Sequence, residues 1–205
     1  MIKKIGVTQR IVHSKHGELR TQIDIKLLEF ISICGYQPII IPYFRLNKKA
    51  NSTNNLLKWI LKIKLSGIVL SGGDDIGKYS LRDKSEILLI KYSLKKKIPI
   101  FGICRGMQII SKYFQTNLKK VRNHAGQHHY IHNTQKNKKK FKVNSFHNFS
   151  IKKCPTNFVI EFLSSDGNIE SIKSKSKKIY ACMWHPERYK KFRIQDIKSF
   201  KNLFR

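Results

Sequence analysis

One cysteine, Cys104, stands where a buried strand is expected to turn directly into a helix. An apolar run over residues 98–103 precedes it, and apolar residues recur at helical spacing over 105–114 after it. Gly102 and Gly106 flank it at minus two and plus two, the pattern of a strand-to-helix nucleophile elbow. Small neighbours let the strand and helix approach closely around a strained nucleophile. The pattern favours a cysteine nucleophile over the alternative, a small buried apolar residue.

The start of a helix is also a favourable position for a nucleophilic cysteine. A helix N-terminus favours the thiolate over the thiol, because the helix dipole is positive there. The backbone N–H of Arg105 is expected to point to the place where an oxyanion would form. A second donor is expected from Ser71-Gly72-Gly73, which follows its own predicted strand at the same edge of the sheet.

A thiol nucleophile needs a base, and eight histidines compete for that role. His185 fits best, because it follows an apolar strand and Glu187 stands two residues later, on the same side of an extended segment. Pro186 between them favours an extended His185. The other histidines are expected in a loop after the first strand, in the Asn144–His147 segment, or at the surface or in a substrate loop: His13, His16, His147, His124, His128, His129 and His132.

Two other sets are candidates for metal ligands. His128 and His132 are four residues apart, and Cys182 precedes His185 by three. Neither set is completed by a second pair at zinc spacing, and no H-E-x-x-H motif occurs. We therefore expect no metal and no cofactor.

The elements that must position these residues follow an α/β pattern up to about residue 116. Strands are expected at 4–8, 38–42, 67–70 and 98–103, alternating with helices at 20–34, 54–63, 83–95 and 105–114. Residues 117–142 are basic and predict a loop or irregular hairpin; β-like runs follow at 141–151, 158–164, 167–172 and 179–184, and a closing helix at 194–204. These features predict a mostly parallel sheet flanked by helices, with antiparallel additions in the second half, in one domain over 1–205.

The charge is extreme, with 42 Lys and Arg against 12 Asp and Glu, for a net charge of +30. The chain is rich in Lys, Asn, Ile, Phe and Tyr together, which favours a drift in amino-acid composition as the origin of the positive charge. Attraction for anionic substrates is the next explanation, and nucleic-acid binding, for which no motif is present, comes last.

No stretch is long enough to span a bilayer, no signal peptide is recognised, and the four separated cysteines indicate reduced thiols. We expect a cytoplasmic protein without a specific nucleic-acid or membrane partner.

In combination, these motifs resemble the class I glutamine amidotransferase superfamily, which has a flavodoxin-like fold, and within it the γ-glutamyl hydrolase branch. The matching segments are 67–74, Arg82-Asp83 with Glu86, 101–108, 143–147, 165–170 and 184–187. The resemblance implies that Cys104 forms a γ-glutamyl thioester, that His185 moves the proton and that Glu187 orients His185. It further implies an oxyanion hole at Gly73 and Arg105 and a glutamyl site at Gly72, Gln108, Asn144, Ser145, Phe146 and His147, supported by Arg82, Asp83 and Glu86.

The chain departs from that branch in being short and in having Asp74-Asp75-Ile76-Gly77 where a proline is usual. Its compact length, its opening residues 5–10 and its charge resemble most the γ-glutamyl-CDP-amidate hydrolases, which serve phosphoramidate decoration of bacterial surface polysaccharides. The substrate expected from this resemblance is a small γ-glutamyl conjugate, either with or without a nucleotide. Three alternatives stay open: a γ-glutamyl-γ-aminobutyrate hydrolase, a glutaminase subunit that feeds ammonia to a synthase partner, and a binding protein on an inactive scaffold.

Overall fold

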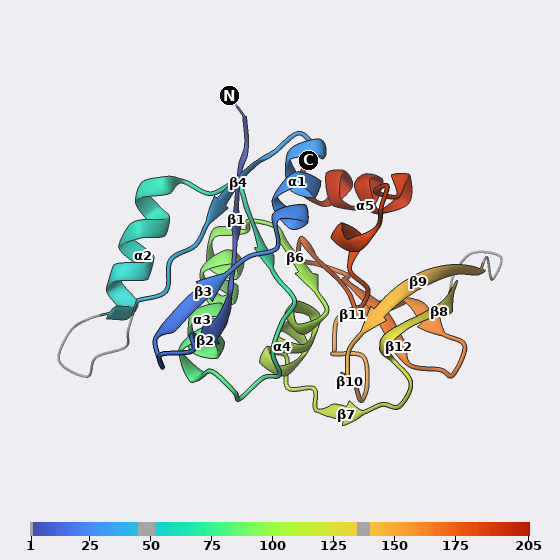
Figure 1. Cartoon of the computed structure of the whole chain (residues 1–205). Helices are drawn as coiled ribbons and strands as arrows, with labels where there is room; N and C mark the ends of the chain where they lie inside the picture. The colour runs from blue at the N-terminus through green and yellow to red at the C-terminus, as the bar shows by residue number, and fades with distance from the viewer. Residues whose placement is uncertain (1, 45–51, 135–139) are drawn as a thin grey trace.

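A nine-stranded sheet runs through the computed structural model, which describes residues 2–44, 52–134 and 140–205 (Figure 1). Five adjacent strands are parallel to one another: β4 (Gln37–Ile40), β1 (Lys4–Val7), β5 (Gly67–Leu70), β6 (Ile100–Ile103) and β13 (Ile179–Cys182). Four antiparallel strands extend the sheet beyond β13: β12 (Ile169–Ser174), β11 (Phe158–Ser164), β8 (Ala125–Asn133) and β9 (Lys140–Phe146). The expected mostly parallel sheet with later antiparallel strands is confirmed.

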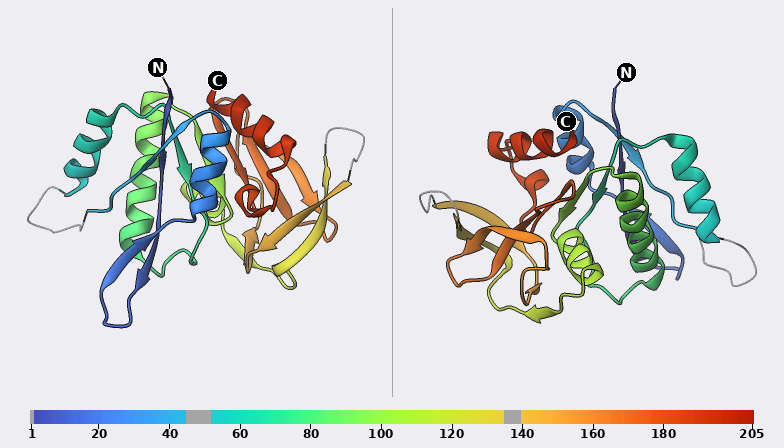
Figure 2. Two further views of the ribbon diagram at one scale, coloured as in Figure 1. Left: turned by 45° about the horizontal axis from the view of Figure 1, so that its top comes forward. Right: turned by 180° about the vertical axis from the view of Figure 1, so that it is seen from behind.

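Helices cover both faces of the parallel part (Figure 2). Residues of α2 (Ser52–Ile63), α3 (Ser80–Lys96) and α4 (Arg105–Tyr113) share one core cluster, and residues of α1 (Ile25–Ile33) and α5 (Ile194–Phe204) share the other. Strand β5 shows the alternation that this requires, because Ile68 and Leu70 face the first cluster while Val69 faces the second. A strand buried on both faces is apolar throughout, as the sequence of β5 is.

Two small antiparallel pairs lie outside the main sheet. Strands β2 (Arg10–His13) and β3 (Leu19–Gln22) form a hairpin, and β7 (Leu118–Lys120) pairs with β10 (Phe149–Ile151). The prediction that His13 lies in a loop was wrong, because His13 ends β2. The helix expected from residue 20 begins at Ile25, because residues 19–22 are exposed and pair with β2, and Asp24 caps the helix by accepting a hydrogen bond from the Lys26 N–H.

Strand β13 corrects another expectation, that all the later strands are antiparallel additions. It pairs in parallel with β6 and antiparallel with β12, so it joins the two parts of the sheet. In this register Cys182 lies beside Ile103, and the residues that follow β13 emerge next to the residues that follow β6. This pairing brings residues 183–187 to Cys104.

No helix in the described ranges is both long and apolar enough to cross a membrane. A short 3₁₀ helix, η1 (Pro186–Arg188), follows β13.

Candidate active site

Cys104 occupies the turn between β6 and α4 with φ 50° and ψ −103°, a backbone conformation that costs free energy for a residue with a side chain. Two contacts hold the turn. The Cys104 N–H donates a hydrogen bond of 2.7 Å to the Cys182 carbonyl on β13. A Cβ at Gly106 would lie 2.1 Å from the Leu70 carbonyl oxygen, so only glycine lets α4 start this close to β5. The strain expected at the elbow is therefore present.

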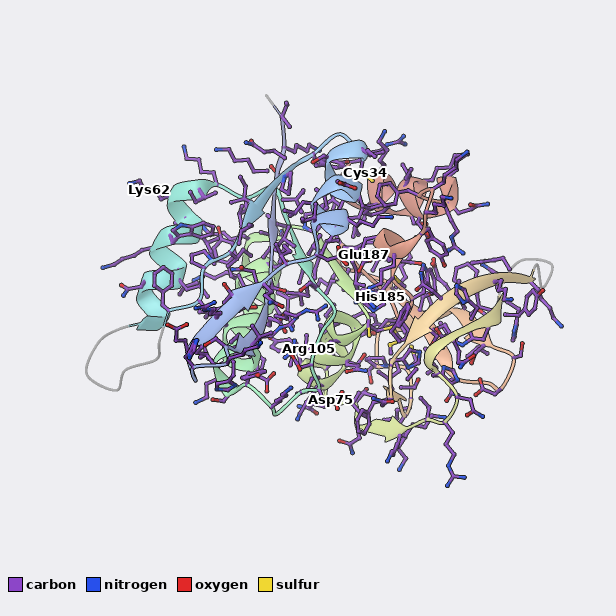
Figure 3. All side chains as sticks on the ribbon, in the orientation of Figure 1. Cys34, Lys62, Asp75, Arg105, His185 and Glu187 are labelled. Atoms are coloured by element: carbon purple, nitrogen blue, oxygen red, sulfur yellow. The ribbon has the colours of Figure 1, made fainter. Side chains whose placement is uncertain are left out.

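His185 follows β13 and is 2% exposed, and its Nδ1 lies 2.6 Å from Glu187 Oε1. Figure 3 shows the two side chains next to each other at the centre of the molecule. Burial disfavours the imidazolium, but the Glu187 carboxylate and a hydrogen bond with Cys104 outweigh it and raise the pKa of His185 to about 9. The structure therefore brings together the cysteine, the histidine and the carboxylate that were identified from the sequence.

The backbone of His185 is fixed by Asn144 on β9. The Asn144 Nδ2 donates to the His185 carbonyl at 2.9 Å, and the His185 N–H donates to Asn144 Oδ1 at 2.8 Å. On the other side of the ring, a Cβ at Gly72 would lie 2.5 Å from His185 Cε1. Asn144 and Gly72 thus set where the imidazole lies.

A buried ion-pair network supports the loop after β5. Arg82 donates to the carbonyls of Ser71 and Gly72 at 2.8 and 2.9 Å and pairs with Glu86 at 3.0 Å. Arg105 pairs with both Glu86 and Asp83. Burial opposes ionisation of Glu86, but the two guanidinium groups outweigh it and lower the pKa of the carboxyl.

A cavity of about 360 Å³ opens in front of Cys104 and His185. Its wall carries both signs of charge, since Arg10, Lys78 and Arg188 line it together with Asp74 and Asp75. Lys78 pairs with Asp74 at 2.6 Å, and Arg188 lies 4.0 Å from both Asp24 and Glu187, so a charged ligand would compete with these pairs for the charged groups of the wall.

The structure divides the sequence-predicted residues into three groups. Gly73, Gln108, Phe146 and His147 line the cavity with Cys104 and His185. Asn144 and Ser145 lie behind the wall, where Asn144 holds His185 and Ser145 donates to the His124 carbonyl. Gly72 lies at a smaller neighbouring cavity, and the Arg105 side chain is buried in the ion-pair network.

The cavity also contains residues that the sequence analysis did not assign. Arg10, Lys78, Asn148 and Arg188 line it without a predicted role. Arg10 ends the opening segment 5–10 that carries part of the resemblance, and Arg188 stands next to Glu187. The expected surface position of His124 was wrong, whereas the alternative place in a substrate loop stays a prediction. His124 is 3% exposed, because the chain folds back against β12 just before β8.

Comparison with known proteins agrees with this geometry. Residues 31–202 match the family described as glutamine amidotransferase class-I, so the chain belongs to the class I glutamine amidotransferase family. It is an enzyme of the hydrolase type.

Two relatives and one solved structure illustrate the range of similarity. The chain is 38% identical over 194 residues to the γ-glutamyl-CDP-amidate hydrolase of Campylobacter jejuni, with 90% of each chain covered. It is 32% identical over 130 residues to one subunit of a glutamine-hydrolysing GMP synthase of Methanococcus aeolicus, covering 60% of this chain and 65% of that one. A glutamine amidotransferase of Thermotoga maritima has the same fold, with a TM-score of 0.65 at 18% identity over 98% of this chain and 84% of that chain.

Proposed function

We propose that this enzyme hydrolyses a γ-glutamyl amide bond through a thioester on Cys104. The Cys104 thiolate attacks the γ-carbonyl carbon, and the tetrahedral oxyanion is met by the backbone N–H groups of Gly73 and Arg105. As the C–N bond breaks, the His185 imidazolium gives its proton to the leaving nitrogen. His185 then takes a proton from water, which attacks the thioester; cleavage of the C–S bond releases glutamate and regenerates the Cys104 thiolate beside the His185 imidazolium.

The observation that carries the proposal is that the strained Cys104 and a buried, carboxylate-paired His185 line the same cavity. A pKa of about 9 keeps the imidazole protonated at neutral pH, which suits a resting thiolate–imidazolium pair. The Glu187 carboxylate stabilises that cation and orients the ring, while Asn144 fixes the backbone. Asn144 and Ser145 accordingly support the site from behind, and Gln108, Phe146 and His147 are the members of the proposed glutamyl site that face the cavity.

The proposed substrate is a conjugate of the γ-glutamyl-CDP-amidate type, in a pathway of surface-polysaccharide phosphoramidate biosynthesis. Support comes from the Campylobacter relative, which matches along 90% of both chains. The cavity adds chemical support, because Asp74 and Asp75 suit the α-ammonium of a glutamyl group, while Arg10 and Arg188 suit its carboxylate or a phosphate.

A glutaminase that passes ammonia to a synthase partner is the second candidate, favoured by the similarity to the GMP synthase of Methanococcus aeolicus. It differs in what it requires, since free glutamine would be the substrate and full turnover would need the partner. A γ-glutamyl-γ-aminobutyrate hydrolase would instead accept a singly charged leaving group.

One comparison of substrates separates these candidates. The purified enzyme is assayed for glutamate release from γ-glutamyl-CDP-amidate, γ-glutamyl-γ-aminobutyrate and glutamine. We expect the highest kcat/KM with the nucleotide conjugate. A preference for γ-glutamyl-γ-aminobutyrate would keep the hydrolase and discard the nucleotide, whereas no turnover of any of the three by the isolated chain would contradict the proposal of a stand-alone hydrolase.

A further inference from the structure

Beside the cavity lies a second cluster of buried polar side chains, of which only His147 also faces the proposed glutamyl site. It consists of His124 just before β8, His147 between β9 and β10, and Glu170 on β12. One possible ligand atom from each lies within 4.8 Å of the others, and the three residues are 3%, 3% and 0% exposed. These residues come from separate segments, so their spacing in the sequence does not reveal the cluster.

Hydrogen bonds on the outer side of the cluster fix which nitrogen of each imidazole carries the proton. His147 Nδ1 lies 3.1 Å from the Phe149 carbonyl, which can only accept, so this nitrogen is the N–H donor. His124 Nε2 lies 2.9 Å from the Asp166 carboxylate, which makes it the donor in the same way. In the neutral rings, His124 Nδ1 and His147 Nε2 are therefore both acceptors.

These two acceptor nitrogens face each other at 3.3 Å, and each lies 3.6 Å from Glu170 Oε1. When both rings are neutral, three lone-pair groups thus converge on one point with no N–H donor between them. Neither Glu170 oxygen has hydrogen-bond geometry with any partner in the described part of the chain, although His129 Nε2 lies 3.3 Å from Oε1. A fully buried carboxylate without hydrogen-bond partners destabilises the folded state unless a cation lies next to it.

We propose that His124 Nδ1, His147 Nε2 and Glu170 bind a divalent transition-metal ion, with Zn²⁺ as the best fit. Two imidazoles and one carboxylate are a zinc ligand set that leaves a fourth position open. Tetrahedral zinc with bonds of roughly 2.0–2.1 Å needs ligand atoms roughly 3.3–3.4 Å apart. The observed separations of 3.3 and 3.6 Å require only a small contraction.

The outer contacts are those expected around metal-bound histidines, whose second nitrogen donates to a carboxylate or a backbone carbonyl. Asp166 serves His124 in this way, and the Phe149 carbonyl serves His147. Asp166 is itself held by Ser164 and by Asn168 Nδ2, the latter at 2.8 Å. His129 is half-buried beside Glu170, and its imidazole is the nearest candidate for a fourth metal ligand.

A metal here would act on the active site through the chain rather than through the reacting atoms. His147 lines the cavity with its neighbours Phe146 and Asn148, so a bound ion would tie this wall to β12. The ion would add stability and shape the substrate cavity. Loss of the metal should accordingly raise KM more than it lowers kcat.

The test is a zinc titration of the full chain after removal of metals with a chelator. We expect one Zn²⁺ per chain that remains bound through gel filtration, measured by elemental analysis, together with a higher Tm than the metal-free chain. Glu170→Gln keeps the shape but removes the charge and should weaken Zn²⁺ binding at least about tenfold. Asp166→Asn, at a half-exposed side chain, should weaken it about 10- to 100-fold while the fold is kept.

The matched control is His128→Ala, which removes an exposed imidazole from the same strand as His129. It should leave both the Zn²⁺ affinity and the Tm increase unchanged. The proposal is overturned if the metal-free chain takes up no stoichiometric Zn²⁺. It is equally overturned if His128→Ala weakens binding as much as Glu170→Gln and Asp166→Asn do, since the ion would then bind to surface histidines.

Discussion

At the scale of single residues, the candidate site consists of three side chains, Cys104, His185 and Glu187, each with a different proposed role. Glu187 is 3% exposed and its Oε1 contacts His185, so its carboxylate lies against the imidazole rather than in water. Cys104 lines the same cavity as His185 and contributes to the raised pKa of its imidazole. Each of the three residues therefore has a different expected effect when it is replaced.

Replacing the nucleophile should abolish turnover. Cys104→Ala removes the atom that would form the thioester, and Cys104→Ser replaces it with a much weaker nucleophile, so kcat should fall on the order of 10³-fold or more in both. The matched control is Cys154→Ala, at a half-buried cysteine outside the cavity, which should retain activity. Mass spectrometry of quenched enzyme should show a γ-glutamyl adduct on Cys104, and full activity of Cys104→Ala would refute the mechanism.

Replacing the carboxylate should change the pH profile. In the proposed mechanism the protonated His185 releases the leaving nitrogen, so kcat/KM should fall as the pH rises through about 9. In Glu187→Gln, burial still disfavours the imidazolium but its counter-charge is lost, so the pKa of His185 and the falling limb should move to lower pH. A pH–rate profile measures this shift, and an alkaline limb that is the same in wild type and variant would show that Glu187 does not act on His185.

At the scale of elements, the pairing of β13 with β6 and the packing of α3 against α4 decide where the site lies. Parallel pairing makes Trp184 and His185 leave the sheet beside Cys104. The network of Arg82, Glu86 and Arg105 ties α3 to α4 and, through the carbonyls of Ser71 and Gly72, to the loop after β5.

Removing the centre of that network should destabilise the fold. Glu86→Ala leaves Arg82 and Arg105 buried without their shared carboxylate, which should lower the free energy of unfolding by about 3–5 kcal/mol. Lys84→Ala, at an exposed position of the same helix, should change it by less than about 0.5 kcal/mol. Urea unfolding of the two variants measures the difference, and equal stability would show that the network does not hold α3 and α4 together.

Elements with strong local patterns were predictable from the sequence. The bounds of β5 and β11 agree with expectation, and so does the helix 194–204, because apolar periodicity and burial agree there. The β2–β3 hairpin was missed because Leu19–Gln22 are exposed and their pairing is with a neighbouring strand rather than with the core. The parallel direction of β13 was missed because it depends on which strand lies beside it, and the sequence of a single strand carries no such information.

The candidate site divides in the same way. Cys104, His185 and Glu187 were found because an elbow and a short extended segment leave local patterns. Arg10 and Lys78, which line the cavity, were not found, because they reach it from β2 and from the segment before α3. The cluster of His124, His147 and Glu170 was not predicted for the same reason, because its members are far apart in the sequence and are brought together only by the fold.

At the scale of the whole molecule, one sheet joins the first and second halves of the chain. This continuity supports the proposal of a single catalytic domain over residues 1–205, with the cavity formed where the two halves meet. The whole chain has a net charge of +30, and Arg10, Lys78 and Arg188 bring positive charge to the cavity wall beside Asp74 and Asp75.

If the positive charge assists the reaction, the effect should depend on salt. Electrostatic steering raises association rates by roughly 10- to 1000-fold and weakens as ionic strength increases. The kcat/KM for γ-glutamyl-CDP-amidate should therefore fall steeply between low and high salt, while that for γ-glutamyl-γ-aminobutyrate should change much less. Arg10→Ala should reduce the salt dependence, because it removes a cation from the cavity wall.

The control for this experiment is Lys198→Ala, which removes one positive charge from an exposed position of α5, outside the cavity lining. Both variants lower the net charge by one, so a difference between them reports the position of the charge and not its total. If kcat/KM for the nucleotide conjugate does not respond to salt, the lysines and arginines are a product of composition alone. Since the thiolate chemistry at Cys104 would be unaffected by that outcome, the hydrolase proposal and the steering proposal can fail independently.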